Sequence, residues 1–326
     1  MTTRRNLLAL GAALALAACK PAAQAPTDTL TPIRFATDWR AQAEQGGFYQ
    51  ALATGEYEKR GLKVTIYQGG PGSNVPQLLA TNAVDLGMGS NSFVVMNLAA
   101  AQAPIKAVAA FMQKDPQVLM AHPDQGVNSL ADLKGHPILL SDASLTAFWV
   151  WLKAKYGFTD AQARKYTFNS APFLADKRAA QQGYVTSEPY TIAKEGGIDP
   201  KVFLLADEGY PSYAAMVIAP DAFAARHPDA VRAFNEASKA GWISYLHGDP
   251  APGDALIRKD NPEMAQDVLD QAREKMRAYA IVGEDGVVGQ MTDERWRTFF
   301  EAAAAQGVYS KDLDYKAAYR LDLLPK

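Results

Sequence analysis

The sequence is poor in cysteine, in long apolar runs and in net charge, and each shortage excludes a class of protein. Cys19 is the only cysteine among 326 residues, so the rest of the chain can form no disulfide, thiolate metal site or thiol nucleophile. No apolar run reaches the roughly 20 residues that a membrane-spanning helix needs. The 33 basic and 35 acidic residues nearly balance, which is unlike the basic excess of nucleic-acid-binding proteins.

The first 18 residues are typical of a secretory signal. Arg4 and Arg5 precede a short apolar run, residues 7–18, which is too short to span a bilayer. Residues 16–19, Leu-Ala-Ala-Cys, resemble a bacterial lipobox, so we predict that Cys19 is lipidated and that residues 19–31 form a tether. An ordinary signal with an incidental cysteine is the alternative. Residues 3–8 also resemble a twin-arginine signal, so export by either the Sec or the twin-arginine route stays open.

From residue 32 the chain alternates short apolar strands with amphipathic helices, which predicts an α/β fold with largely parallel sheets. A first set of elements covers residues 33–121. A second set follows over residues 129–219 and includes a predicted strand at 166–169, a helix at 174–181 and a strand at 183–187. After Pro220 the chain is mostly helical. We predict two lobes, one from residues 32–116 and 214–326 and the other from 117–213, hinged near 115–120 and 209–213.

Two kinds of residue are candidates for binding a ligand in the cleft between such lobes. Helix starts offer free N–H groups, and plain N-capping is the alternative role for their side chains; they are Ser73, Asn74, Ser90, Asn91 and Ser144. The aromatic residues Trp39 and Tyr184 and the carboxylates Asp38 and Glu188 suit a planar, nitrogen-rich ligand, because rings stack and carboxylates accept hydrogen bonds. For Glu188 helix capping is again the alternative. On an extended strand, Tyr184, Thr186 and Glu188 would share one face.

Other aromatic residues and the histidines favour structural roles. Phe148, Trp149 and Trp151 have near-helical spacing and are expected in the core. The histidines are far apart in the sequence and show no metal-binding spacing, so we expect them on the surface and expect no metal or other cofactor; they are His122, His136, His227 and His247.

An ordered set of segments resembles the substrate-binding proteins of ABC importers, in the branch that binds thiamine-pyrimidine precursors, nitrate and alkanesulfonates. These segments are residues 37–39, 47–53, 58–64, 69–71, 84–90, 129–135 and 183–190, and the last of them includes Tyr190. The resemblance implies a type II periplasmic-binding-protein fold, with two α/β lobes closing around a small solute and a helical C-terminal tail. The pattern is most similar to the pyrimidine-precursor binders, but Gln42 and Gln45 replace the asparagine and histidine of their motif.

The resemblance implies a monomeric, lipid-anchored periplasmic receptor that delivers its solute to an inner-membrane ABC permease and its ATPase. A thiamine pyrimidine precursor is the expected kind of solute, because Asp38, Glu44 and Glu188 disfavour a bare anion. A receptor for an alkanesulfonate, taurine or nitrate is the alternative. An enzyme of the same fold is less favoured, since no cysteine nucleophile remains and no Gly-x-Ser-x-Gly motif occurs. A periplasmic sensor is a further alternative.

Overall fold

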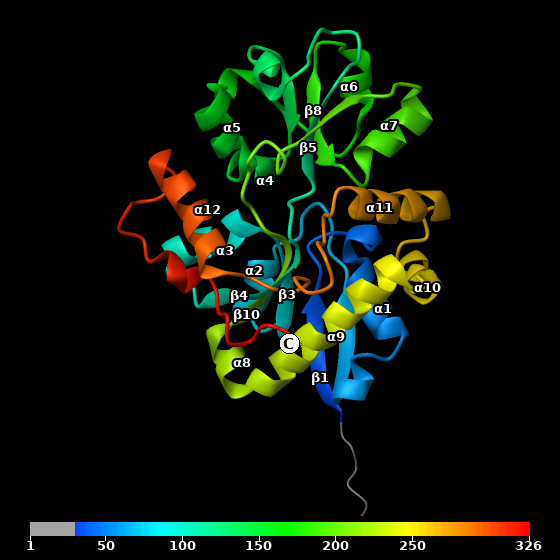
Figure 1. Cartoon of the computed structure of the whole chain (residues 1–326), viewed down its shortest axis with the longest axis vertical. Coiled ribbons are helices and arrows are strands. Elements are labelled where there is room, and N and C mark those ends of the chain that lie inside the picture. The colour runs from blue at the N-terminus through cyan, green and yellow to red at the C-terminus, as the bar shows by residue number, and fades with distance from the viewer. Residues whose placement is uncertain (1–29) are drawn as a thin grey trace, which may run out of the picture.

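In the computed structural model, which describes residues 30–326, the chain forms two lobes, each built on a five-stranded sheet (Figure 1). The sheet of lobe 1 has the order β2-β1-β3-β10-β4 and that of lobe 2 has the order β7-β6-β8-β5-β9. The predicted signal, Cys19 and most of the predicted tether lie outside the described residues. None of the helices in the described part of the chain has the length and apolar character that crossing a membrane requires.

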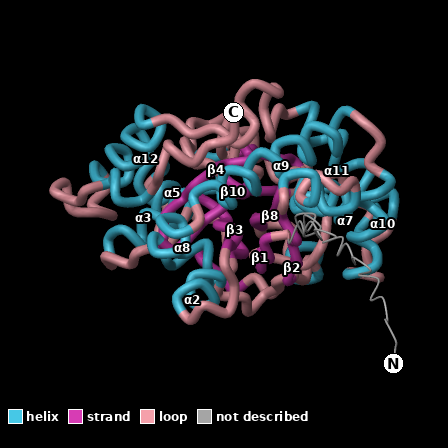
Figure 2. Tube along the Cα trace, turned by 90° about the horizontal axis from the view of Figure 1, so that it is seen from below, coloured by secondary structure: helices cyan, strands magenta, loops and turns pink. Residues whose placement is uncertain are grey.

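Lobe 1 takes its strands from both ends of the described chain. They are β1 (Thr31–Ala36), β2 (Leu62–Tyr67), β3 (Leu86–Asn91), β4 (Ile105–Met112) and β10 (Ala214–Pro220). Its helices lie on the two sides of this sheet in the view from below (Figure 2); they are α1 (Gly46–Ala53), α2 (Val75–Ala80), α3 (Ser92–Ala100), α8 (Asp221–Arg226), α9 (Pro228–His247), α10 (Ala251–Asp260), α11 (Gln266–Ala278) and α12 (Asp293–Ala305).

Lobe 2 is continuous in sequence. Its strands are β5 (Gln117–Ala121), β6 (Ile138–Leu140), β7 (Ala163–Lys165), β8 (Ala180–Tyr184) and β9 (Lys201–Leu204). Its helices are α4 (Asp142–Leu145), α5 (Phe148–Tyr156), α6 (Ala171–Ala175) and α7 (Glu188–Gly196). Two short crossovers, residues 113–116 and 205–213, join this lobe to lobe 1.

Lobe 1 is held together by unusually close helix packing where α1 meets α9. A Cβ atom at Gly47 would lie 2.1 Å from the ring of Trp242, and one at Gly241 would lie 2.2 Å from the carbonyl oxygen of Gly47. The two backbones therefore approach as closely as they do because both positions are glycine. The amide of Gln50, fully buried on α1, donates to Ser244 Oγ at 3.0 Å and to the Asp249 carbonyl at 2.7 Å. This contact places the loop after β1, which carries several candidate site residues.

Several predicted elements differ from the structure. The sheets are mixed rather than largely parallel, because β10 runs antiparallel to β3 and β4, and β5 runs antiparallel to β8 and β9. The predicted strand at 166–169 is wrong, since β7 ends at Lys165, and the predicted helix at 174–181 is wrong, since α6 ends at Ala175 and β8 begins at Ala180. The run Ala180-Gln181-Gln182 has no β-branched residue, yet it becomes a strand because it fills the place between β6 and β5.

The predictions for the aromatic residues and the histidines are also right for some residues and wrong for others. Phe148 and Trp149 are buried in the core, as predicted, whereas Trp151 is only half-buried. His122 is buried, which contradicts the predicted surface position: its ring stacks on Phe173 and its Nε2 lies 2.7 Å from the Phe173 carbonyl oxygen. Tertiary packing of a polar ring against an aromatic one, with one hydrogen bond satisfied, explains the difference. Within residues 30–326, no group of His, Cys, Asp or Glu side chains is arranged to hold a metal ion.

Candidate functional site

Carboxyl groups from both lobes meet around one phenol where the lobes face each other. Burial raises the pKa of the Tyr184 phenol well above its usual value, and the negative charges of four nearby carboxyl groups add to the rise; they belong to Asp115, Asp38, Glu44 and Glu188. Tyr184 is the last residue of β8, and Glu188 begins α7. Asp38 follows β1 in lobe 1. The ends of strands from two sheets thus converge on one acidic cleft.

Asp38 is held by a neighbouring strand and keeps one acceptor free. The Ser90 hydroxyl, on β3, donates to Asp38 Oδ2 at 2.5 Å. Asp38 Oδ1 and the Oε1 of Gln45, a residue only 2% exposed, are both buried and accept no hydrogen bond from the described residues. Burial raises the pKa of Asp38, while Ser90 and the Gln45 amide oppose the shift. Neither of these two oxygens is satisfied by the described residues, so a donor from a solute or from water would complete the hydrogen bonding there.

On the lobe 2 side, Glu188 accepts hydrogen bonds from within its own lobe. Its Oε2 accepts from the Tyr184 backbone N–H at 2.8 Å, and its Oε1 accepts from the Tyr166 hydroxyl at 3.4 Å. Burial nevertheless raises the pKa of Glu188 to about 7, and the nearby Glu44 adds to the rise. Burial likewise raises the pKa of Asp115, in the first crossover, to about 7. The ionised forms are thus disfavoured while the cleft is closed.

Direct bonds between the lobes hold this cleft closed. The Thr186 hydroxyl donates to Glu44 Oε1, and the carbonyl of Thr186 accepts from the Gln271 side chain on α11. Thr186 and Glu44 are almost fully buried. Nearer the surface, the Tyr190 hydroxyl donates to Asp267 Oδ2 at 2.6 Å. Thr186 therefore joins lobe 2 to two separate elements of lobe 1.

The four carboxyl groups of the cleft form no salt bridge with a basic side chain of the described residues. Among the salt bridges of the described residues, none involves Asp38, Glu44, Asp115 or Glu188. Arg295 acts electrostatically on Asp115, but its guanidinium is engaged by backbone carbonyls and by the ring of Tyr213, 4.1 Å from it. A solute that brings positive charge or N–H donors would satisfy these groups.

The predicted site residues fall into two groups. Asp38, Trp39, Gln45, Ser90, Tyr184 and Glu188 are brought together at the cleft. Ser144 is buried in α4, and its hydroxyl lies 2.9 Å from that of Ser141. The others lie at the edge or cap helices. Asn74 and Asn91 accept from N–H groups of the helices that follow them, Ser73 is exposed, Gln42 precedes a 3-10 turn, and Tyr190 contacts Asp267.

Some residues of the site gave no usable signal in the sequence. β8 ends at Tyr184, so Thr186 turns away from the predicted shared face and contacts lobe 1 instead. Tyr166 and Phe168 lie in the loop after β7, a stretch predicted to be a strand. Asp115 marked only the hinge region. The hydrogen-bond partners of Tyr166 and Thr186 are 22 and 142 positions away in sequence, so the local pattern carries no information on these two contacts.

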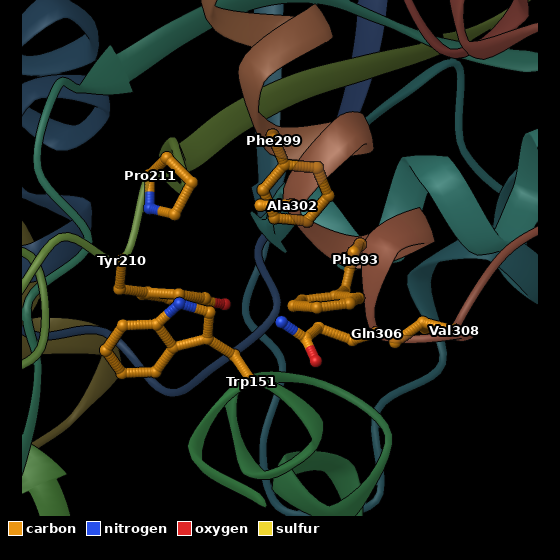
Figure 3. Close-up of a pocket in the computed structure, with 9 residues that line it drawn as sticks. Phe93, Trp151, Tyr210, Pro211, Phe299, Ala302, Gln306 and Val308 are labelled. Carbon is orange, nitrogen blue, oxygen red and sulfur yellow. The ribbon is translucent and has the colours of Figure 1, made fainter. Parts of the chain in front are cut away.

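A second junction between the lobes lies beside the crossover 205–213 (Figure 3). It is an apolar crevice of about 10 Å³, lined by Trp151 of lobe 2, Tyr210 of the crossover and Phe93 and Phe299 of lobe 1. This volume holds about one water molecule. The crevice is too small for a solute. A larger cavity of about 490 Å³, lined by Lys134, Arg164 and Arg178, lies within lobe 2 and contains none of the groups that join the two lobes.

The fold, with two mixed α/β lobes, two crossovers and a cleft between them, defines a periplasmic-binding-protein architecture. Residues 42–251 match the model of the NMT1/THI5-like family. Since this is more than half of the chain, the chain belongs to that family. No curated protein sequence matches the chain.

Solved structures show the same architecture at low identity. The alkanesulfonate-binding protein SsuA from Xanthomonas axonopodis pv. citri, bound to MOPS, is 16% identical, with 89% of this chain and 98% of that one covered and a TM-score of 0.65. A Candida albicans protein with the generic periplasmic binding protein fold is 16% identical, with 91% and 98% covered and a TM-score of 0.63. The desulfurization enzyme DSZB is 11% identical, with 90% and 97% covered and a TM-score of 0.57. Similar structures thus include mostly binding proteins but also an enzyme.

Proposed function

We propose that this protein is the solute-binding component of an ABC importer, anchored in the periplasm through lipidated Cys19. Its family and its fold support this proposal. A monomer would close its two lobes, residues 32–116 with 214–326 and residues 117–213, on a small solute. An inner-membrane permease and its ATPase would then accept the solute from the closed form. Ligand binding to the closed form shifts the population toward that form, and we propose no catalytic step.

We further propose that the solute is small, planar and nitrogen-containing, such as a thiamine pyrimidine precursor. The single observation that carries this choice is the pair of buried acceptors without donors, Asp38 Oδ1 and Gln45 Oε1, in a cleft of four carboxyl groups. An aminopyrimidine edge supplies adjacent N–H donors to such acceptors. Glu188 and the ring of Tyr184 would contact its other side.

An anion receptor is the competing candidate, and the similarity to alkanesulfonate-binding proteins favours it. The side chains of this cleft favour the nitrogen-containing solute. The first N–H groups of α3 already donate, that of Ser92 to Ser212 Oγ at 3.1 Å and that of Phe93 to Asn91 Oδ1 at 3.0 Å. Glu188 and Pro189 occupy the start of α7. A bare anion would therefore meet carboxylates and few free donors.

Calorimetry on the protein lacking residues 1–18 tests this choice. We expect aminopyrimidines to bind and taurine, alkanesulfonates and nitrate to bind weakly or not at all. Glu188→Ala should weaken aminopyrimidine binding by roughly 10- to 150-fold, since a hydrogen bond to a charged group contributes about 1.5–3 kcal/mol. Trp39→Ala should weaken it comparably. Glu195→Ala, which removes an exposed carboxylate from the same helix, is the matched control and should have no effect. Tight sulfonate binding that Glu188→Ala leaves unchanged or improves would support the anion receptor instead.

A further inference from the structure

An aromatic pair joins the two lobes at the cleft. Trp39, in the loop after β1, and Phe168, in the loop after β7, have ring centroids 4.5 Å apart and planes inclined by 51°. The ring of Phe168 also lies 5.2 Å from that of Tyr166. Since Tyr166 donates to Glu188 and Trp39 adjoins Asp38 in sequence, this row of three rings runs from one carboxyl group of the cleft to the other.

Phe168 occupies a position that is unfavourable for phenylalanine on two counts. Its φ is 61°, in the left-handed region where a side chain costs about 1–2 kcal/mol. Its exposed fraction is 43%, so nearly half of the benefit of burying an aromatic ring is missing. Glycine or asparagine is the usual choice at such a backbone position. The aromatic contacts of its ring are with Trp39 across the lobes and with Tyr166 in its own lobe.

We infer that Phe168 is a specificity-determining residue, which covers the bound solute together with Trp39 and selects for a flat ring. This inference rests on the function proposed above. A centroid separation of 4.5 Å leaves no room for a third ring between the pair. A bound ring would therefore contact the pair from one side, toward the carboxyl groups. The ring of Phe168 would then lie against a flat solute and slow its release, whereas a solute without a ring gains nothing from this contact.

Two neutral probes separate ring recognition from hydrogen bonding. 4-Aminopyrimidine presents an amino donor beside a ring-nitrogen acceptor, whereas acetamide presents an amino donor beside a carbonyl acceptor and has no ring. Release is followed by stopped-flow fluorescence in the wild type, Phe168→Ala and Phe168→Leu, with Leu321→Ala as a control that truncates an exposed apolar side chain elsewhere. Phe168→Ala should release 4-aminopyrimidine about three- to tenfold faster, and Phe168→Leu should recover only part of the loss. Release of acetamide should not change.

A second measurement needs no solute. The contribution of Trp39 to acrylamide quenching is obtained as the difference between the wild type and Trp39→Phe, and it is then measured again in the Phe168→Ala background. We expect quenching of Trp39 to rise at least twofold in that background. Phe168→Gly should melt at a higher temperature than Phe168→Ala, because glycine accepts the left-handed backbone without strain.

The outcomes separate this inference from the proposed function. If 4-aminopyrimidine binds the wild type but leaves Phe168→Ala at the same rate, the role of Phe168 is refuted and the receptor function stands. If neither probe binds the wild type, the proposed solute class is wrong, and the quenching measurement alone decides the inference. Unchanged quenching of Trp39 in Phe168→Ala would then overturn it.

Discussion

Glu188→Gln should make the protein more stable at pH 8 and leave its stability unchanged at pH 4.5. In the folded state, burial raises the pKa of Glu188 from the ordinary 4.5 to about 7. Between pH 4.5 and about pH 7, the Glu188 carboxyl has lost its proton in the unfolded state but still holds it in the folded state. The free energy of unfolding therefore falls as pH rises through this window and is constant above it. Glutamine does not titrate, and its amide oxygen can still accept the N–H of Tyr184.

The size of the effect follows from the shift. A difference of about 2.5 pKa units corresponds to about 3 kcal/mol, at about 1.4 kcal/mol per unit. This value is an upper bound, because Glu188 is half-buried and opening of the cleft would hydrate it. With an unfolding entropy of about 2 cal/mol/K per residue, a chain of this size would gain at most about 5 °C in melting temperature at pH 8.

Calorimetric melting of the wild type and Glu188→Gln at pH 4.5, 6 and 8 measures this difference directly. Glu195→Gln, an exposed change on the same helix, should follow the wild type at every pH. Asp115 has its pKa raised in the same direction, so Glu188→Gln should remove only part of the wild-type decline, and adding Asp115→Asn should remove more. Parallel melting curves for the wild type and Glu188→Gln across this range would refute the reasoning.

Three further changes test other parts of the structure. Thr186→Val keeps the shape but removes the donor to buried Glu44, at a cost of about 1–3 kcal/mol to the closed form, so small-angle scattering should show a larger radius of gyration without solute; identical profiles would contradict this. Gly47→Ala should lower the melting temperature by the equivalent of at least 1–3 kcal/mol, whereas Gly70→Ala, with nothing within 4 Å of its added Cβ, should not; equal melting would argue against the α1–α9 contact. Cys19→Ser should release the protein from membranes or leave its signal uncut, and unchanged fractionation and processing would refute lipidation.

The sequence predicts those elements whose local pattern and tertiary environment agree. The strands at 62–67 and 105–112 follow from the sequence, because β-branched or apolar residues fill them and turn-forming residues flank them. The strand at 180–184 does not, since its residues have no strand preference and its conformation depends on its two neighbours in the sheet. The residues of the first two strands are enough to predict their conformation, whereas the strand at 180–184 can be predicted only from the arrangement of the whole lobe.

The same distinction applies to the site. Asp38, Ser90 and Glu188 could be singled out because each lies near the end of a strand or begins a helix, and such ends gather at one edge of a sheet. Asp115 and Phe168 could not, because their importance comes from partners in other segments. Nothing near Phe168 in the sequence indicates a contact with Trp39, which precedes it by more than a hundred residues.

The central position of β10 sets the order in which the chain can fold. This strand lies between β3 and β4 in lobe 1, yet it follows the whole of lobe 2 in the sequence. While the chain emerges from the ribosome, β3 and β4 are separated by a gap that only residues 214–220 can fill. Lobe 2 has all of its strands before that point and can form its core first. The half-made lobe 1 meanwhile exposes two strand edges that can pair wrongly. A Sec-type route, which carries unfolded chains, would move this vulnerable interval into the periplasm, whereas a twin-arginine route would complete it in the cytoplasm.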